Sequence, residues 1–216
     1  MLGSSPAVSA NPDPADQSRW RSAGSAEGVR MPEAERRPGW DTGDWTGMPS
    51  VKLWPYDPRW SAEYEQARDA IASRMVGLDV VIEHIGSTAV PGLAARRGID
   101  ILIGPRDPTQ TAACVVRLVG LGYAYHFTKT EWVHLSGRGH KLHLTPLGSE
   151  RWVRHLLFRD YLRAHPETAA EYERVKREMI QTHGADGKGY VDGKTAFVEA
   201  VVERARRASA DPGALH

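Results

Sequence analysis

The chain is poor in three features that would have named a function class at once. A single cysteine, Cys114, excludes an intramolecular disulfide. The apolar neighbours of Cys114 predict a thiol on the buried face of a helix. No run of about 20 apolar residues is present to cross a membrane, and the N-terminus lacks the basic start and apolar run of a secretion signal. We therefore expect a cytoplasmic protein.

Excess charge of one sign is also missing. The 28 lysines and arginines nearly balance 27 aspartates and glutamates, which leaves a net charge of +1. No overall field then favours binding to nucleic acid or to a membrane surface. Any chemistry has to be argued from local groups of residues.

Composition divides the chain into three parts. Residues 1–47 are rich in Ser, Pro, Ala, Gly, Asp and Arg without a hydrophobic period, and such a segment buries too little apolar surface to offset the entropy of ordering. We expect a disordered N-terminal extension over 1–47, one domain over 48–207 and a disordered tail over 208–216. Because the expected domain itself begins with a methionine, Met48, it stays open whether residues 1–47 are a genuine part of the protein.

Hydrophobic periodicity predicts an α/β layer arrangement, in which a mixed sheet of four or five strands carries flanking helices. Asp57 as N-cap and Pro58 mark the start of the first helix. The expected strands are 79–85, 99–103, 123–127, 131–135 and 141–145, with a hairpin turn at 136–139; the expected helices are 58–75, 107–119, 149–164, 166–183 and 194–207.

A carboxylate interrupts the second expected strand. Asp100 stands within the apolar run 98–103, which reads as a strand covered on both faces, where an unpaired charge is costly. Two interpretations are open: Asp100 binds a metal ion or ligand, or it ties down a neighbouring loop through backbone N–H groups.

A hydroxyl-rich turn, Gly86-Ser87-Thr88, follows the first expected strand. Glycine allows close backbone approach, and successive N–H groups with two hydroxyls suit a phosphate. The same tripeptide is also an ordinary strand exit or helix cap. Taken alone, the turn does not decide between these roles.

Together, the turn and the aspartate resemble the signature of the GrpB family, a group within the nucleotidyltransferase superfamily. The resemblance covers about residues 50 to 206. It rests on residues 84–95 (HIGSTAVPGLAA), 99–101 (IDI), 54–60 (WPYDPRW), 142–144 (LHL) and 154–162 (RHLLFRDYL), and on Tyr190, Lys194 and Phe197. It implies the compact nucleotidyltransferase-like core.

In that superfamily the Gly-Ser turn holds a nucleotide triphosphate, and strand carboxylates bind Mg²⁺ that supports attack on phosphorus. By position, Gly86, Ser87 and Thr88 are then expected to contact phosphate and Asp100 to bind a divalent metal, Mg²⁺ or Mn²⁺. The superfamily pattern has a second carboxylate two residues later, where this chain has Leu102. A single carboxylate holds Mg²⁺ weakly unless substrate phosphates complete its shell.

Two histidines are candidates to supplement the aspartate. His143 stands where a later strand of the superfamily carries an acidic residue, as a metal ligand or a general base. His84, at the end of the first strand, is a second candidate for ligand contact. Both can equally be hydrogen-bonded core residues.

Basic residues supply the other half of a phosphate site. Arg96, just before the Asp100 strand, has the geometry to clamp phosphate in a bidentate fashion. Lys194 is expected near a helix start, where anions bind. For Arg159 we favour a structural role, as an anchor for Asp100 or a loop.

Two hypotheses follow from the resemblance. The first is a nucleotidyltransferase-like enzyme that acts on a nucleotide or phosphorylated metabolite. The second is a non-catalytic phosphate-ligand-binding or regulatory module that has lost the metal carboxylates. GrpB-like domains also occur fused to dephospho-CoA kinase domains, but this chain has no Gly-x-x-x-x-Gly-Lys-Ser/Thr phosphate loop, so it is not that kinase by itself. The sequence does not indicate an oligomeric state.

Overall fold

Residues 52–183 and 187–210 are described here from a computed structural model of the chain. The extension expected over 1–47 and residues 211–216 of the expected tail lie outside these described residues. Within them, no helix combines the length and apolar content that a membrane crossing needs.

A five-stranded mixed sheet forms the centre of the domain and confirms the expected fold class. The spatial order of its strands is β1-β2-β5-β4-β3. The strand β2 pairs parallel with β5, and the other neighbours pair antiparallel. The bounds are β1 (Val80–Ile85), β2 (Ile99–Pro105), β3 (Ala124–Lys129), β4 (Trp132–Gly137) and β5 (His140–Leu144).

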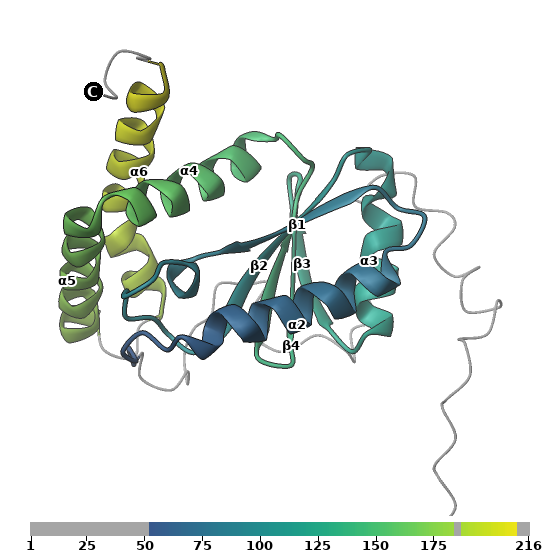
Figure 1. Ribbon diagram of the computed structural model, residues 1–216, viewed down its shortest axis with the longest axis horizontal. Helices are drawn as coiled ribbons and strands as arrows, with labels where there is room; N and C mark the ends of the chain where they lie inside the picture. Colours follow the sequence, from purple (N-terminus) through teal and green to yellow (C-terminus); the bar gives the residue numbers. More distant parts are fainter. Residues whose placement is uncertain (1–51, 184–186, 211–216) are drawn as a thin grey trace, which may run out of the picture.

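The helices lie around this sheet. Figure 1 shows α2 running along the sheet, and α4, α5 and α6 gathered beside it on the side away from α3. Their bounds are α2 (Arg59–Arg74), α3 (Thr111–Gly120), α4 (Glu150–Ala164), α5 (Pro166–His183) and α6 (Gly187–Ala210), with single 3₁₀ turns η3 (Ser87–Ala89) and η4 (Pro108–Gln110).

Short polar residues stand at the element boundaries, although α2 begins at Arg59, one residue after the expected Pro58. The carboxylate of Asp57 accepts the backbone N–H of Arg59 at 3.0 Å, at the start of α2. The hydroxyl of Ser149 accepts the N–H of Trp152 at the start of α4, which satisfies a donor that the helix itself leaves unpaired. The hairpin between β4 and β5 turns at residues 138–139, both with positive φ.

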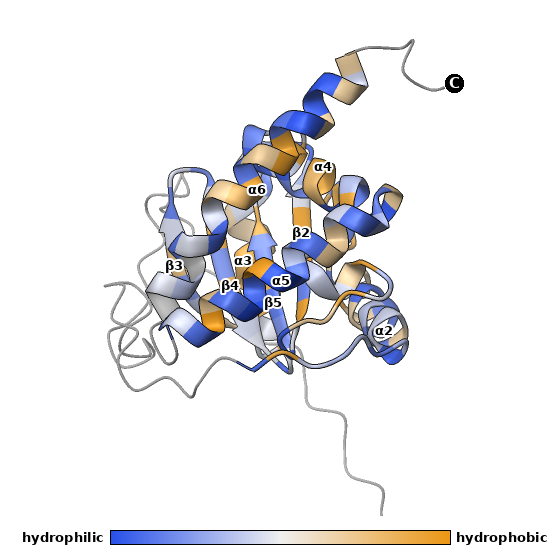
Figure 2. Cartoon of the chain, turned by 90° about the vertical axis from the view of Figure 1, so that its left-hand side faces the viewer, coloured by the Kyte–Doolittle hydropathy of each residue, from blue (hydrophilic) through white to orange (hydrophobic). Residues whose placement is uncertain are grey.

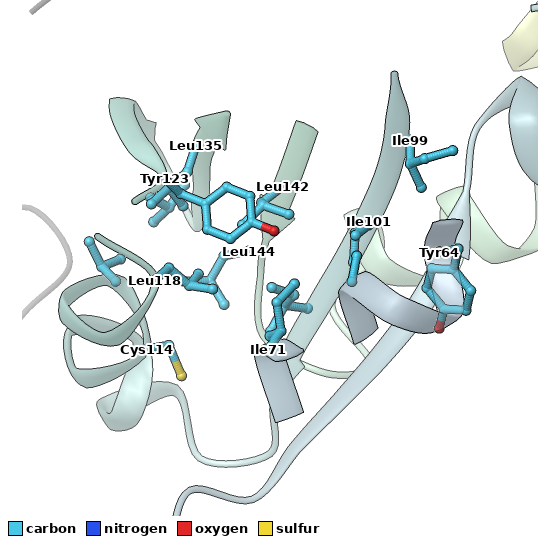
Figure 3. Packing of buried hydrophobic residues seen from close by; sticks show 14 of the residues in the cluster. Tyr64, Ile71, Ile99, Ile101, Cys114, Leu118, Tyr123, Leu135, Leu142 and Leu144 are labelled. Carbon is cyan, nitrogen blue, oxygen red and sulfur yellow. The ribbon is translucent and has the colours of Figure 1, made fainter. Parts of the chain in front are cut away.

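One face of the sheet packs against α2 and α3. Alternate residues of β2, namely Ile99, Ile101 and Ile103, belong to this core together with residues of both helices (Figure 3). Cys114 of α3 is fully buried there, and burial raises the pKa of its thiol to about 11. The prediction of a core thiol is therefore confirmed.

The other face of the sheet meets the C-terminal helices. Leu102 and Ile85 pack against Trp152 of α4. A separate apolar cluster joins α4, α5 and α6 to the segment after η3. Figure 2 shows α5 and α6 in front of the strands, with hydrophobic and hydrophilic residues alternating along them, as in amphipathic helices.

The last helix differs from its predicted bounds. It begins at Gly187 and ends at Ala210, whereas the glycines before Lys194 led us to expect a loop up to that residue. Glycine is a poor helix former, but here it serves packing: a side chain at Gly193 would collide with Met179 of α5. Tertiary contact thus outweighs local propensity.

A glycine of β2 allows α4 to approach the sheet. A Cβ atom on Gly104 would lie 2.5 Å from the Trp152 ring. We expect Gly104→Ala to lower the free energy of unfolding by about 1–3 kcal/mol, because the ring has to move. Urea unfolding measures this value.

Gly120→Ala is the matched control. Its Cβ would meet nothing within 4 Å. Alanine stabilises a helix relative to glycine by up to about 1 kcal/mol, so this variant should not lose stability. Equal losses of stability in the two variants would contradict the packing assigned to Gly104.

Candidate functional site

Asp100 and His143 meet on the face of the sheet that α4 covers. In the parallel pair of β2 and β5, Asp100 lies opposite Lys141, and Leu102 lies opposite His143. Alternate residues of a strand share a face of the sheet. The side chains of Asp100 and His143 therefore project from the same face. The His143 Nε2 lies 3.2 Å from the Asp100 Oδ1. In the neutral ring, Nε2 therefore carries the proton that it donates to the carboxylate.

The carboxylate of Asp100 is held in its ionised form. Burial opposes ionisation, but the charge of Lys141, the hydrogen bond from His143 and the charge of Lys194 outweigh it and hold the pKa of Asp100 well below its usual range. The Lys141 Nζ is 3.8 Å from the Asp100 Oδ1. About a quarter of the Asp100 side chain, 23%, remains exposed. Asp100 is thus a fixed negative charge with little basicity.

The glycine turn lies directly against this carboxylate. Gly86 has a φ of +72°, and a Cβ atom there would stand 2.8 Å from the Asp100 Oδ2. Both the backbone conformation and the space therefore require glycine. The antiparallel pairing of Ile85 with Asp100 brings the turn to this place.

The two hydroxyls of the turn face protein groups. The Ser87 Oγ accepts from the Lys176 Nζ at 3.2 Å. The Thr88 Oγ1 is 3.0 Å from the His84 Nε2. These bonds fasten the turn to the rest of the fold, and a phosphate contact through either hydroxyl stays a prediction.

Lys176 is the main site residue that the sequence analysis missed. Its side chain, on α5, is buried and donates both to Ser87 and to the carbonyl of Ala94. Burial lowers the pKa of Lys176 to about 7. A lysine one turn after Tyr172, on the buried face of an amphipathic helix, is the signal that could have identified it.

Lys194 and Arg96 also reach the site. The Lys194 Nζ lies 4.5 Å from the centre of the Tyr190 ring, and the Arg96 guanidinium lies 5.9 Å from the same ring. Burial lowers the pKa of Lys194 to about 8; Asp100 opposes this shift, whereas Arg96 and Lys141 add to it. The expected helix start at Lys194 was wrong, because the residue lies inside α6. Its position near Asp100 arises from helix packing.

His84 supports the turn from behind. Its ring is buried and stacks on Tyr64 with centroids 4.6 Å apart, while Nε2 bonds Thr88. Burial lowers the pKa of His84 to about 4, so the ring is neutral at pH 7. The sequence left open whether His84 contacts a ligand or is a hydrogen-bonded core residue. These contacts support the core role.

Arg159 anchors a strand, which agrees with the structural role favoured from the sequence. One guanidinium nitrogen donates to the Glu83 carboxylate at 2.7 Å and to the carbonyl of His84 at 3.0 Å. These two partners are on β1, and the other guanidinium nitrogens donate to Asp160 of α4. The described contacts of Asp100 are with His143 and Lys141 instead.

A wall of aromatic rings borders the Asp100–His143 pair. The ring centroids of His134, His155 and Trp132 lie 5.3, 5.5 and 5.9 Å from that of His143. Burial lowers the pKa values of His134 and His155 to about 3, so both rings are neutral at pH 7. Neither histidine was predicted to be a site residue, because strand pairing and the packing of α4 bring them here.

These residues do not fit a magnesium site made by the protein. Among the described residues, no group of three His, Cys, Asp or Glu side chains is placed to hold a metal ion. Leu102, at the position of the second carboxylate, is buried under Trp152. Mg²⁺ requires oxygen ligands, whereas Asp100 is already engaged by a histidine and a lysine.

Comparison with known proteins settles the family. A family model described as GrpB protein matches residues 50–204. The chain belongs to the GrpB family. It is 35% identical to a UPF0157 protein of Streptomyces coelicolor over 79% of this chain and 94% of that protein, and 34% identical to one of Pseudomonas aeruginosa over 75% and 70%.

Solved and longer proteins extend the comparison. The crystal structure of GrpB from Enterococcus faecalis superposes with a TM-score of 0.67 at 28% identity and covers 74% of this chain and all of that one. A dephospho-CoA kinase of Mycolicibacterium paratuberculosis is 28% identical over 72% of this chain but only 46% of its own length. A Cid1 poly(U) polymerase structure bound to MgATP gives a TM-score of 0.44 at 12% identity, over 58% of this chain and 45% of that one; this likeness carries no functional argument.

Crowding between the turn and the carboxylate is testable with two glycines. Gly86→Ala and Gly77→Ala both place a side chain at positive φ, which costs about 1–2 kcal/mol. Only the Cβ at Gly86 would meet Asp100, since nothing lies within 4 Å at Gly77. We expect Gly86→Ala to lose an additional 1–3 kcal/mol or so of unfolding free energy; equal losses in urea unfolding would contradict the contact.

The buried histidines predict loss of stability in acid. The folded-state pKa values of His134 and His155 lie at about 3, below the unfolded value of about 6.5. Between these limits the unfolded chain binds more protons, so the free energy of unfolding falls as the pH falls. Urea unfolding at several pH values from about 7 to about 4 measures the slope. His155→Gln should make the slope shallower, and a stability independent of pH over this range would contradict neutral burial.

Proposed function

We propose that this GrpB domain is a nucleotidyltransferase-like protein that binds the phosphate groups of a nucleotide or another phosphorylated metabolite beside the 86–88 turn. One observation carries the proposal: the charges of Lys141 and Lys194 act on a single carboxylate, Asp100, and the charge of Arg96 acts on Lys194. The cations outnumber the carboxylate, and their mutual repulsion contributes to the lowered pKa of Lys194. A polyphosphate relieves that repulsion.

The cations of the chain take the place that metal ions have in a magnesium-dependent site. Phosphoryl and nucleotidyl groups need their negative charge neutralised before they bind in a partly buried site. Lysine and arginine provide this through charge-assisted hydrogen bonds. The proposed binding therefore does not require a divalent metal.

Catalysis of a transfer reaction is the first of two functions that this site allows. The Asp100–His143 pair favours it, because a partly exposed carboxylate oriented by a histidine stands next to the turn. The low basicity of Asp100 suits electrostatic stabilisation and the orientation of a lysine better than proton abstraction.

A non-catalytic ligand-binding or regulatory module is the second outcome. The specific observation in its favour is Leu102, which fills the position of a metal carboxylate with a buried apolar side chain. Both outcomes share the same phosphate site. An assay of transfer with the ligand that binding identifies separates them.

Calorimetry of the full chain with nucleoside triphosphates, CoA precursors and sugar phosphates, each in Mg²⁺ or in chelator, tests the proposal. We expect one class to bind in chelator, and Lys194→Met to weaken that binding by about ten- to a hundredfold, the value of one lost charged hydrogen bond. Lys129→Met, at an exposed end of β3, is the control and should bind normally. Failure of every phosphate ligand to bind would refute the proposal.

Asp100→Asn distinguishes phosphate binding by lysines from phosphate binding through a metal ion, because the two predict different changes in affinity. Asparagine keeps an oxygen that accepts from the His143 Nε2 but removes the negative charge. If lysines bind the phosphates, affinity in chelator should stay equal or rise, because the excess of positive charge grows. If Asp100 holds a metal that binds the phosphates, affinity in Mg²⁺ should fall steeply. Titration of the variant in both buffers gives the answer.

A further inference from the structure

Lys176 carries a buried charge without a carboxylate partner. The residue is 1% exposed, its Nζ lies 4.8 Å from the centre of the Tyr172 ring, and within the described part of the chain it forms no ion pair. Glu173, on the same helix, pairs with Arg177 at 2.6 Å instead. A buried ammonium group without a partner costs free energy that an apolar side chain does not. Packing alone therefore does not account for a lysine at this position.

The ammonium group of Lys176 is bonded to the phosphate turn itself. Nζ donates to the Ser87 Oγ at 3.2 Å and to the carbonyl of Ala94, so one cation joins the two ends of the segment 87–94. Ser87 is partly exposed, whereas Lys176 is closed off from solvent. The Ser87 hydroxyl thus stands between the buried charge and the exposed side of the turn.

Donation by Lys176 fixes the role of the Ser87 hydroxyl. An ammonium group has hydrogen-bond donors and no acceptor, so the Ser87 Oγ accepts in this bond and its own hydrogen goes to a different acceptor. A phosphate oxygen beside the turn is a strong, charged acceptor. A hydroxyl that already accepts from a cation is polarised and donates more strongly. The two bonds then run in one direction, from Lys176 through Ser87 to the ligand.

We propose that Lys176 is a positioning residue of the phosphate site, which acts on the ligand through Ser87 and makes ligand affinity depend on the protonation of Lys176. The inference rests on the proposed function, because the ligand is the same. Charged Lys176 orients the hydroxyl and adds its positive field to the site. Neutral Lys176 has a lone pair that accepts the hydroxyl hydrogen, which reverses the bond and withdraws that hydrogen from the ligand.

The charges around Lys176 place this change near neutral pH. Burial lowers the pKa of Lys176 to about 7; Glu173 opposes this shift, whereas Lys194 of α6 and Arg177 add to it. Burial raises the pKa of the adjoining Tyr172, so that ring stays neutral. Affinity for phosphate should therefore fall as the pH rises through the pKa of Lys176. Because a bound anion stabilises the charged lysine, binding should be accompanied by proton uptake.

Calorimetry of the full chain with inorganic triphosphate in chelator, from about pH 6 to about pH 9, tests the inference. We expect Lys176→Met to weaken binding by about tenfold at the acid end, the value of a lost charged hydrogen bond, and by much less at the alkaline end. The ratio of the two affinities cancels the titration of the ligand and of Lys194. Lys129→Met, which removes an exposed lysine, is the control and should bind as the unaltered chain does.

Proton uptake is a second measurement, which a purely structural lysine would not change. Repeating the titrations near neutral pH in buffers of different ionisation enthalpy counts the protons taken up with each triphosphate. The unaltered chain should take up more protons than Lys176→Met.

Ser87→Ala tests the path through the hydroxyl. If the charge acts through Ser87, this variant and Lys176→Met should weaken binding by similar factors, and the double variant should lose little more than either. Thermal unfolding shows whether each variant is folded. Ser87→Ala leaves the ammonium group in the core, so it still tests the inference if Lys176→Met does not fold: its binding should be weaker and less dependent on pH than that of the unaltered chain.

Three results would overturn the inference. Equal affinity and equal proton uptake in the unaltered chain and Lys176→Met would overturn it while the proposed function stands. Losses in Ser87→Ala and Lys176→Met that add fully in the double variant would do the same. Absence of triphosphate binding to the unaltered chain would also overturn it, and the calorimetric panel of phosphate ligands shows whether the proposed function falls with it.

Discussion

The negative charge of Asp100 is the constraint on which the rest of the site depends. The carboxylate stands near the start of a core strand, where neighbouring cations and the hydrogen bond from His143 keep it ionised. Each neighbouring element contributes to that environment: β5 brings Lys141 and His143, β1 brings Gly86, and α6 brings Lys194. The sheet order makes this possible, because β2 lies between β1 and β5.

Charge balance then decides what the site can bind. An arrangement with several carboxylates attracts divalent metal ions, which in turn attract phosphate. Here one carboxylate stands among more cations, so the net attraction is for an anion directly. Helix α5 links this site to the rest of the domain, because Lys176 holds Ser87 while Glu173 holds Ala94. The turn is thereby part of the packed core.

Local patterns predicted most of the fold and the central pair of the site. Alternation shows which residues share a face of β2 with Asp100 and of β5 with His143, and the resemblance to the GrpB family supplied the expectation that the two residues belong to one site. The sequence could not reveal Lys176, because its role arises from helix packing that local periodicity does not encode. The start of α6 was missed for a related reason: Gly193 argues locally for a loop, but its lack of a side chain leaves room for Met179 of α5 beside the helix.

The pKa of the Lys194 ammonium group tests the account most directly. Nuclear magnetic resonance of lysine side chains, assigned with Lys194→Met, measures it in the full chain with and without a nucleoside triphosphate in chelator. The account predicts a value of about 8 in the free protein and a rise when the triphosphate binds, since the anion stabilises the charged form. A value near the ordinary 10.4 or so, unchanged by any phosphate ligand, would contradict a crowded cationic site made for phosphate.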